Sequence, residues 1–371
     1  MTGQFITEVP QSVGSGTRLN GSPTSEALEI RILDPTCDPG WDRLVSSHPD
    51  FTFFHSSAWM RVLCETYGHK ALALYCSRHG KPKVMLPLVE VASRFTGRRG
   101  VSLPFTDSCD PLVFGDSDPD IVFQALRALA REREWKHFEL RGRLACDLLP
   151  RPSIAFHGHS LDLRDGAEVL FNKFASSVRR AIRKAERSGL TVRLSTSEEA
   201  IREFYRLHAR TRRRHGLPPQ PFLFFQNIYR EIIKPGLGFV AVAHDGSKTA
   251  AAAVYFHTEK NAVFKFGASD ERCQDLRPNN LVMWHAIRHL ACNDVETLHL
   301  GRTSHRNEGL RRFKLAWGAG EEPIEYFRFD MRTNDWAASR DSTSGSHNAL
   351  FSKLPLSLNR LIGAAIYPHL D

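Results

Sequence analysis

The residues whose types and spacing most directly suggest chemistry are arginines, which occur in clusters on predicted helices. Within residues 177–187 the basic side chains fall on one helical face by their three- and four-residue spacing: Arg180, Arg183, Lys184 and Arg187. Such a stripe can grip a phosphate backbone or a diphosphate, and a solvated helix face is the alternative interpretation. A second cluster closes a later predicted helix, where positive charge also complements the helix dipole: Arg210, Arg212, Arg213 and Arg214.

Two further polar groups follow elements that commonly border ligand sites. Arg302 and Ser304 come directly after a predicted strand, the place where α/β sheets often bind ligands, and a capped loop is the alternative. His285 and His305 are candidate bases near neutral pH, and a purely structural histidine is the alternative for each. We expect no metal site, because no pair of histidines combines the helical spacing of metal ligands with a nearby acidic residue.

Composition bounds the class of protein. The 371 residues suggest two domains, and 42% hydrophobic with 25% charged residues is ordinary for a globular chain. A net charge of +9 favours an anionic partner, or else a basic protein without one. The seven cysteines are widely spaced and contain no CxxC pair. We therefore expect reduced thiols in the cytoplasm rather than a disulfide framework.

The elements that must position these residues occur in the same order twice. A helix over 57–67 precedes strands over 71–77 and 83–91, a helix over 120–135 and a strand over 136–142. In the second half, strands over 238–244 and 249–257 flank Asp245-Gly246, a strong hairpin signal. A strand over 262–267, an irregular loop over 268–279, a helix over 280–292 and a strand over 296–301 follow. This parallel predicts two copies of one α/β module.

The remaining segments divide the chain. We expect a flexible leader over 1–26, a first module over 27–163 that begins with a strand over 27–33, and a second module over 164–330. A helical insert over 165–187, 196–214 and 221–233 opens the second module. A polar linker over 331–349 and a C-terminal helix complete 331–371. That helix, 350–370, either docks back on the protein or contacts a membrane surface.

Three stretches together resemble the FemABX family of non-ribosomal peptidyl transferases, and most closely its FemAB-like branch found with exopolysaccharide and exosortase systems. The first is the basic helix 178–190, which ends in Gly189-Leu190. The second is Phe204-Tyr-x2-His-x2-Thr211-x2-Arg214-His-Gly216. The third is Gly301-Arg302 followed by Gly309-Leu-Arg-Arg-Phe313-Lys314-x-x-Trp317-Gly318.

The resemblance implies a fold and roles for particular residues. It implies two tandem GNAT-like acyltransferase modules, each a mixed sheet flanked by helices. Lys314 would be the cation that stabilises the oxyanion of acyl transfer, and Phe313 would shape the pocket beside the reacting carbonyl. Substrate-binding positions would be Arg214 and Thr211 for an anionic acceptor, with Arg302, Ser304 and Trp317. An amphipathic helix with Phe313 in the core and Lys314 in solvent is the alternative.

The donor is left open by the sequence. GNAT enzymes that use acyl-CoA hold its pyrophosphate on a glycine-rich turn at a helix start. The equivalent segment here, 275–280, has no glycine, and Pro278 removes a backbone donor. A conventional CoA site is therefore disfavoured, and aminoacyl-tRNA or another activated carrier remains. Against tRNA, aromatic residues do not interleave with the arginine clusters.

The sequence thus predicts an N-acyltransferase that moves an aminoacyl or acyl group onto an amine of a cell-envelope peptide or glycan precursor. Its expected place is the cytoplasm, peripheral to the inner face of the membrane, with no DNA partner. The first alternative is an acyl-CoA-dependent GNAT N-acetyltransferase. The second is a non-catalytic glycan-binding or scaffold module of exopolysaccharide biosynthesis.

Overall fold

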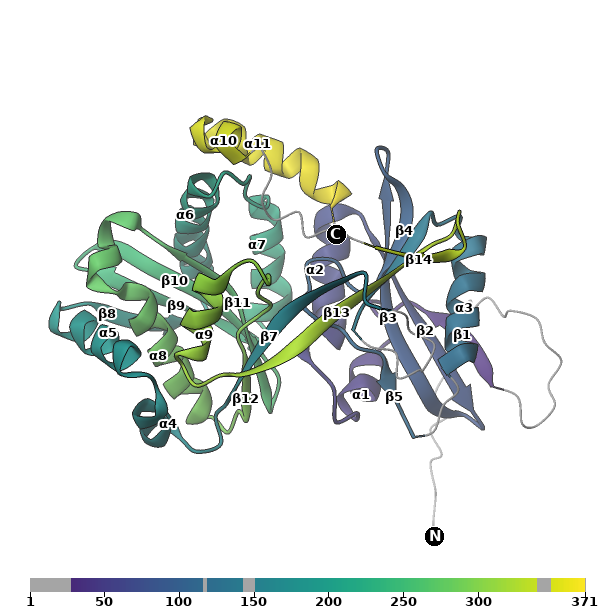
Figure 1. Ribbon diagram of the computed structural model, residues 1–371, viewed down its shortest axis with the longest axis horizontal. Helices are drawn as coiled ribbons and strands as arrows, with labels where there is room; N and C mark the ends of the chain where they lie inside the picture. The colour runs from purple at the N-terminus through teal and green to yellow at the C-terminus, as the bar shows by residue number, and fades with distance from the viewer. Residues whose placement is uncertain (1–27, 116–118, 143–150, 339–347, 371) are drawn as a thin grey trace, which may run out of the picture.

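The computed structural model describes residues 28–115, 119–142, 151–338 and 348–370. Within them, fourteen strands form one mixed sheet with helices on both faces (Figure 1). Two modules of similar element order lie side by side, as expected for a tandem α/β protein. The leader expected over 1–26 and most of the expected linker, 339–347, lie outside the described residues.

The first module is built on a long hairpin. Strands β2 (Lys70–Arg78) and β3 (Lys81–Ser93) turn at His79-Gly80, and both turn residues have positive φ. Strand β1 (Glu29–Leu33) and strand β4 (Gly97–Val101) extend the hairpin at its two edges, β5 (Leu112–Val113) pairs with β3, and β6 (His137–Arg141) pairs in parallel with β4.

Side chains alternate across this hairpin and so serve two cores. Residues 71, 73 and 75 of β2 face α1 (Trp41–Ser46), the short helix η1 (Phe53–His55) and α2 (Ser57–Tyr67). Residues 72, 74 and 76 face α3 (Pro119–Glu132) on the opposite side.

The second module repeats the plan. Its strands, all consecutive neighbours in the sheet, are β8 (Thr191–Ser195), β9 (Gly238–Asp245), β10 (Lys248–His257), β11 (Asn261–Ser269) and β12 (Thr297–His299). One face is covered by α6 (Glu198–Arg214), α7 (Phe222–Ile228) and its π-helical continuation η2 (Tyr229–Ile233). The other is covered by α4 (Ala167–Lys173), α5 (Ser176–Arg187) and α8 (Pro278–Ala291).

The modules share a core and exchange strands. Trp59 of α2 packs against Phe224 of α7 and Phe256 of β10, with ring centroids 6.0 and 5.8 Å apart. Strand β7 (Ile154–Asp162) pairs with β12, whereas β13 (Gly320–Asp330) returns from the second module to pair with β6. Because β7 and β13 also pair with each other, they join the two modules at the centre of the sheet (Figure 1).

The C-terminal helices dock across both modules. Helices α10 (Asn348–Lys353) and α11 (Leu356–Ile366) pack on α6, and the final turn η4 (Tyr367–His369) packs on α2 and β3. This is the first of the two arrangements considered for residues 350–370, in which the segment docks back on the protein. Gly363 makes it close, since a Cβ there would overlap the carbonyl oxygen of Pro219.

Several local expectations are confirmed and others are wrong. Helix 57–67 and the turn at Asp245-Gly246 occur as predicted. The helix expected over 165–187 is two helices, because Phe174 is extended and buries its ring against Trp284 and Trp317. The loop expected over 268–279 contains the 3-10 helix η3 (Glu271–Leu276), and the expected polar linker contains strand β14 (Asp335–Ala337), paired with β13.

Candidate functional site

Strands β11 and β12 separate partway along their length. They pair in parallel only from Asn261↔Thr297 to Val263↔His299. Beyond that point β11 has a bulge, because its register with β10 skips Lys265 between Phe264 and Phe266. A bulge re-aims a side chain, and here the Lys265 ammonium donates to the carbonyl oxygen of Phe105, 2.5 Å away in the first module. The opening between the strands therefore faces the other module.

A loop of the first module, residues 102–110, closes this opening and is held from several directions. The Trp59 indole N–H donates to Thr106 Oγ1 at 2.8 Å, and the Tyr326 hydroxyl donates to the Asp107 carbonyl at 2.8 Å. Leu103 and Phe105 have φ of 64° and 58°, a left-handed conformation that costs energy for such residues. Strain of this kind persists only where surrounding contacts over-determine it, and it concentrates at functional sites.

Lys314 reaches the same place from α9 (Glu308–Leu315). The helix begins at Asn307, whose side chain accepts the Leu310 N–H at 3.1 Å. Lys314 is only 4% exposed, and its ammonium donates to the carbonyl oxygens of Gly301 at 2.7 Å and Arg302 at 3.1 Å. The alternative of a solvated Lys314 is therefore wrong. Two carbonyls fix the nitrogen and leave one N–H for another acceptor.

Gly301 lets the side chains of Asp107 and Lys314 approach its backbone closely. Its φ of 79° favours glycine, and a Cβ at this position would lie 3.4 Å from Asp107 Oδ2 and 3.9 Å from Lys314 Nζ. Arg302 approaches Asp107 with Nε to Oδ1 at 3.9 Å, and its guanidinium donates to the Tyr326 hydroxyl at 2.8 Å. Asp107, Arg302 and Lys314 thus form one cluster around this glycine, and Lys265 enters it from β11.

Positive charge is in excess in this cluster. Burial lowers the pKa of Lys314 to about 8, although Asp107 acts in the opposite direction. Burial also lowers the pKa of Lys265. Burial alone would raise the pKa of Asp107, but the surrounding cations, Lys265 foremost, outweigh it and hold that pKa below its usual value. One carboxylate therefore faces three cations, an environment suited to stabilising a new negative charge.

His299 connects the cluster to a cavity of about 540 Å³. Its Nδ1 accepts the Gly301 N–H at 3.1 Å, so this hydrogen bond assigns the ring proton to Nε2. Burial lowers the pKa of His299 despite the nearby Asp107, which keeps the ring neutral near pH 7. The cavity is walled by both modules, with Phe54 from the first and Asn261 and Glu322 among the others.

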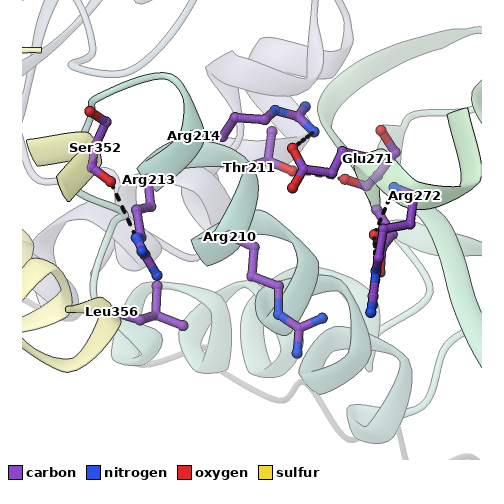
Figure 2. Close-up of a pocket in the computed structure, with 10 residues that line it drawn as sticks. Arg210, Thr211, Arg213, Arg214, Glu271, Arg272, Ser352 and Leu356 are labelled. Atoms are coloured by element: carbon purple, nitrogen blue, oxygen red, sulfur yellow. Dashed lines mark hydrogen bonds and ion pairs between the residues drawn. The ribbon is translucent and has the colours of Figure 1, made fainter. Parts of the chain in front are cut away.

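The structure places Arg214 and Thr211 elsewhere. They line a second cavity, of about 560 Å³, between the end of α6, η3 and the C-terminal helices; Figure 2 shows its arginines gathered around it. Arg214 Nη1 lies 3.7 Å from Glu271 Oε2, and Thr211 Oγ1 donates to the Ser269 carbonyl at 3.3 Å. This cavity has four guanidinium groups and two carboxylates: Arg210, Arg213, Arg214, Arg272, Asp270 and Glu271. The joint site expected for Arg214 and Arg302 is therefore divided between two places.

The other sequence-predicted residues are mostly structural in position. Trp317 is fully buried and packs on Phe174, with ring centroids 5.0 Å apart, and Phe313 packs on Trp317 at 6.2 Å. Trp317 thus belongs to the core of the second module behind Lys314, and Phe313, which is half-buried, packs against that core. The Ser304 hydroxyl accepts the Arg306 N–H at 3.2 Å.

The arginine stripe and the histidines have local roles. The stripe on α5 is exposed, and Arg183 lies over the Phe171 ring at 5.6 Å, which fits the solvated-face interpretation. His305 Nδ1 is 2.8 Å from His157 Nε2, and burial lowers the pKa of His285.

Among the described residues, no group of three His, Cys, Asp or Glu side chains is arranged to hold a metal ion. Likewise, no helix in the described ranges has the length and apolar character needed to span a bilayer.

Sequence reasoning missed Asp107, Lys265 and His299. One signal was present, since Lys265 is a charged residue between Phe264 and Phe266 in a predicted strand.

The start of α8 has no glycine-rich turn, as the sequence of 275–280 indicated. Arg277 has φ of 60°, a conformation that favours glycine, and Pro278 is the first helical residue.

Comparisons with known proteins agree with this architecture. The family described as acetyltransferase (GNAT) domain matches residues 172–315. The crystal structure of FemX is similar with a TM-score of 0.61 at 14% identity, over 78% of this chain and 95% of FemX. L-PGS from Bacillus licheniformis (TM-score 0.52, 15% identity, 89% and 98% covered) and a tandem GNAT protein from the clavulanic acid biosynthesis pathway (0.53, 12%, 82% and 99%) share the fold. No curated protein matches the sequence.

Proposed function

We propose that this chain, a GNAT-type acyltransferase with the tandem fold of FemX, transfers an aminoacyl group to an amine of a cell-envelope peptide or glycan precursor. The observation that carries the proposal is the buried Lys314 ammonium, held by two carbonyls beside Asp107 where β11 and β12 part. Acyl transfer to an amine builds negative charge on the carbonyl oxygen, and a pre-positioned cation at that oxygen is the largest single aid to the reaction.

Each group in the cluster has a role in that step. The free N–H of Lys314 donates to the developing oxyanion, and Arg302 adds positive charge beside it. Asp107 keeps Lys314 protonated, since it raises the pKa that burial lowers. The excess positive charge also disfavours an ammonium form of the acceptor, so the amine enters as a neutral nucleophile. The attacking nitrogen then forms the new C–N bond as the C–O bond of the donor ester breaks. The proton that the nitrogen loses passes through solvent to the departing ester oxygen, which leaves as a hydroxyl group.

The arginine cavity at the end of α6 supports a phosphate-bearing substrate. Its guanidinium groups outnumber its carboxylates, and Arg210 is exposed. A guanidinium group can donate two parallel hydrogen bonds to two oxygens of one phosphate. Both candidate donors, aminoacyl-tRNA and acyl-CoA, carry phosphates, and so do precursors of the cell envelope.

The second candidate function is an acyl-CoA-dependent N-acetyltransferase, which the match to the GNAT acetyltransferase domain favours. The beginning of α8 speaks against a conventional CoA site. Pro278 leaves the first turn without one of the backbone N–H groups that such a site uses for the pyrophosphate.

A transfer assay separates these functions. The purified chain is given an extract of cell-envelope precursors with either a pool of aminoacyl-tRNA carrying labelled amino acids or labelled acetyl-CoA, and mass spectrometry follows the label. We expect transfer from the aminoacyl-tRNA pool, reduced about 10²- to 10³-fold by Lys314→Met. Lys260→Met is the matched control, because Lys260 is exposed and pairs with surface Glu296.

Each other outcome identifies an alternative. Transfer from acetyl-CoA alone assigns the protein to N-acetyltransferases. Glycan binding without transfer from either donor points to the non-catalytic scaffold, and full activity of Lys314→Met removes the role of this lysine.

A further inference from the structure

Large apolar side chains that face solvent gather at one edge of the molecule. Phe95 is 81% exposed at the tip of the β3–β4 hairpin, and Leu361 and Leu358 of α11 are 68% and 42% exposed. The hairpin contacts the turn η4 that directly follows α11, because the Phe95 and His369 rings are 4.8 Å apart and Arg99 donates to the His369 carbonyl at 2.8 Å. Figure 1 shows α11 along one edge of the molecule, across both modules.

Helix α11 exposes apolar side chains to water, unlike an ordinary surface helix of a globular protein. Its inward positions, Asn359, Gly363 and Tyr367, are buried at four-residue spacing. Four of its five exposed positions are apolar, namely Leu358, Leu361, Ala364 and Ala365, and the fifth is Ser357. A surface helix of a globular protein normally has the reverse pattern, and a clustered exposed apolar patch marks an interaction site.

Basic side chains predominate on the elements that carry this patch. Residues 348–370 contain no Asp or Glu and two basic side chains, Lys353 and Arg360. The hairpin tip, 93–99, likewise has no acidic residue, and it exposes Arg94 and Arg98 on either side of Phe95. Arg98 Nη1 lies 3.9 Å from Glu134, an exposed and therefore weak pair. Apolar side chains flanked by arginine and lysine match the surface of an anionic bilayer.

We propose that this surface docks the protein on a bilayer of anionic phospholipid. Its apolar side chains are Phe95, Leu358, Leu361 and Leu370, the last 42% exposed. Its basic side chains are Arg94, Arg98, Lys353 and Arg360. The apolar side chains enter the boundary between headgroups and acyl chains, and the basic side chains meet the headgroup phosphates. A second copy of the chain fits less well, because two such faces would bring like charges together.

Docking in this orientation has a consequence for substrate access. Ser352 and Leu356 of the C-terminal helices form part of the wall of the arginine cavity. The cavity therefore lies beside the docked surface, where a membrane-borne phosphate can reach Arg210 and Arg213. The docking surface is separate from the Lys314 cluster and does not depend on acyl transfer.

Vesicle sedimentation tests the proposal with the full chain. The probes are vesicles of phosphatidylcholine alone and of phosphatidylcholine with about one third phosphatidylglycerol. We expect the wild type to bind the anionic vesicles and to bind neutral ones much more weakly, with binding reduced by added salt. Phe95→Ser with Leu361→Ser should weaken binding at least about tenfold, since each removes an apolar side chain that enters the bilayer on docking.

Two controls keep the test specific. Val169→Ser replaces a side chain that is 46% exposed on α4, outside the docking surface, and should bind like the wild type. Lys314→Met should also bind normally, so loss of transfer and loss of docking are distinguishable. The proposal is overturned if the wild type stays in solution with anionic vesicles, or if the double variant sediments as the wild type does. It is also overturned if light scattering shows a dimer that Leu361→Ser abolishes while vesicle binding is absent.

Discussion

Replacing Lys314 by methionine gives a thermodynamic test of the buried ammonium that needs no substrate. Methionine keeps a similar length of chain and removes the charge. Because the pKa of Lys314 falls to about 8 in the folded protein, from an ordinary value of 10.5, the folded state disfavours the charged form. At pH 7 this costs the wild type about 3 kcal/mol of stability, at 1.36 kcal/mol for each pKa unit.

The cost disappears as pH rises. Between pH 8 and 10.5 the unfolded chain still binds the proton that the folded chain has released, so stability rises with pH in that window. Relative to the methionine variant, the wild type should gain about 2.5 kcal/mol between pH 7 and pH 10. The variant also leaves the carbonyl oxygens of Gly301 and Arg302 without their hydrogen bonds from Lys314, which costs roughly 1–3 kcal/mol each. That loss of stability does not vary with pH, so it cancels in the comparison.

Urea denaturation of both proteins at pH 7 and pH 10 measures the difference, and Lys260→Met serves as the exposed-lysine control. If wild type and Lys314→Met change in stability by the same amount between the two pH values, the ammonium is not desolvated and the proposed oxyanion site fails. In the transfer assay, the same pKa predicts wild-type activity that declines as pH rises through about 8, because the neutral amine no longer carries the charge that the oxyanion needs.

Three further predictions concern neighbouring groups. Asp107→Asn removes the carboxylate that raises the pKa of Lys314, so the alkaline decline in transfer activity should move to lower pH, whereas Asp165→Asn on the surface should leave it in place. Burial lowers the pKa of His208 to about 3, so acidification from pH 7 to 4.5 should cost the wild type about 2.5 kcal/mol more stability than it costs His208→Gln in urea titrations. Gly363→Ala should destabilise the fold by about 1–3 kcal/mol through overlap with Pro219, while a calorimetric scan of Ala364→Ser should show little change.

Local sequence patterns determined much of the architecture. Gly68 adopts φ of 70° after the 57–67 helix, and Asp245-Gly246 turns one hairpin, because both are decided by the conformations that neighbouring residues allow. The basic-helix, Thr-x-x-Arg and Phe-Lys stretches were sufficient to indicate the tandem fold and to single out Lys314. By contrast, β13 is rich in Glu and contains Pro323, and it is a strand because β6 and β7 both offer it hydrogen bonds.

The composition of the site was decided only by the tertiary structure. Lys265 and Phe105 are 160 residues apart in the chain, and Asp107 meets Lys314 only because the loop of the first module closes the opening of the second. The sequence by itself determined which elements form and that a lysine stands on the last helix of the second module, since these depend on short-range spacing. Whether that lysine is buried, which carboxylate it faces, and that Arg214 lies in another cavity depend on long-range packing, which no local pattern encodes.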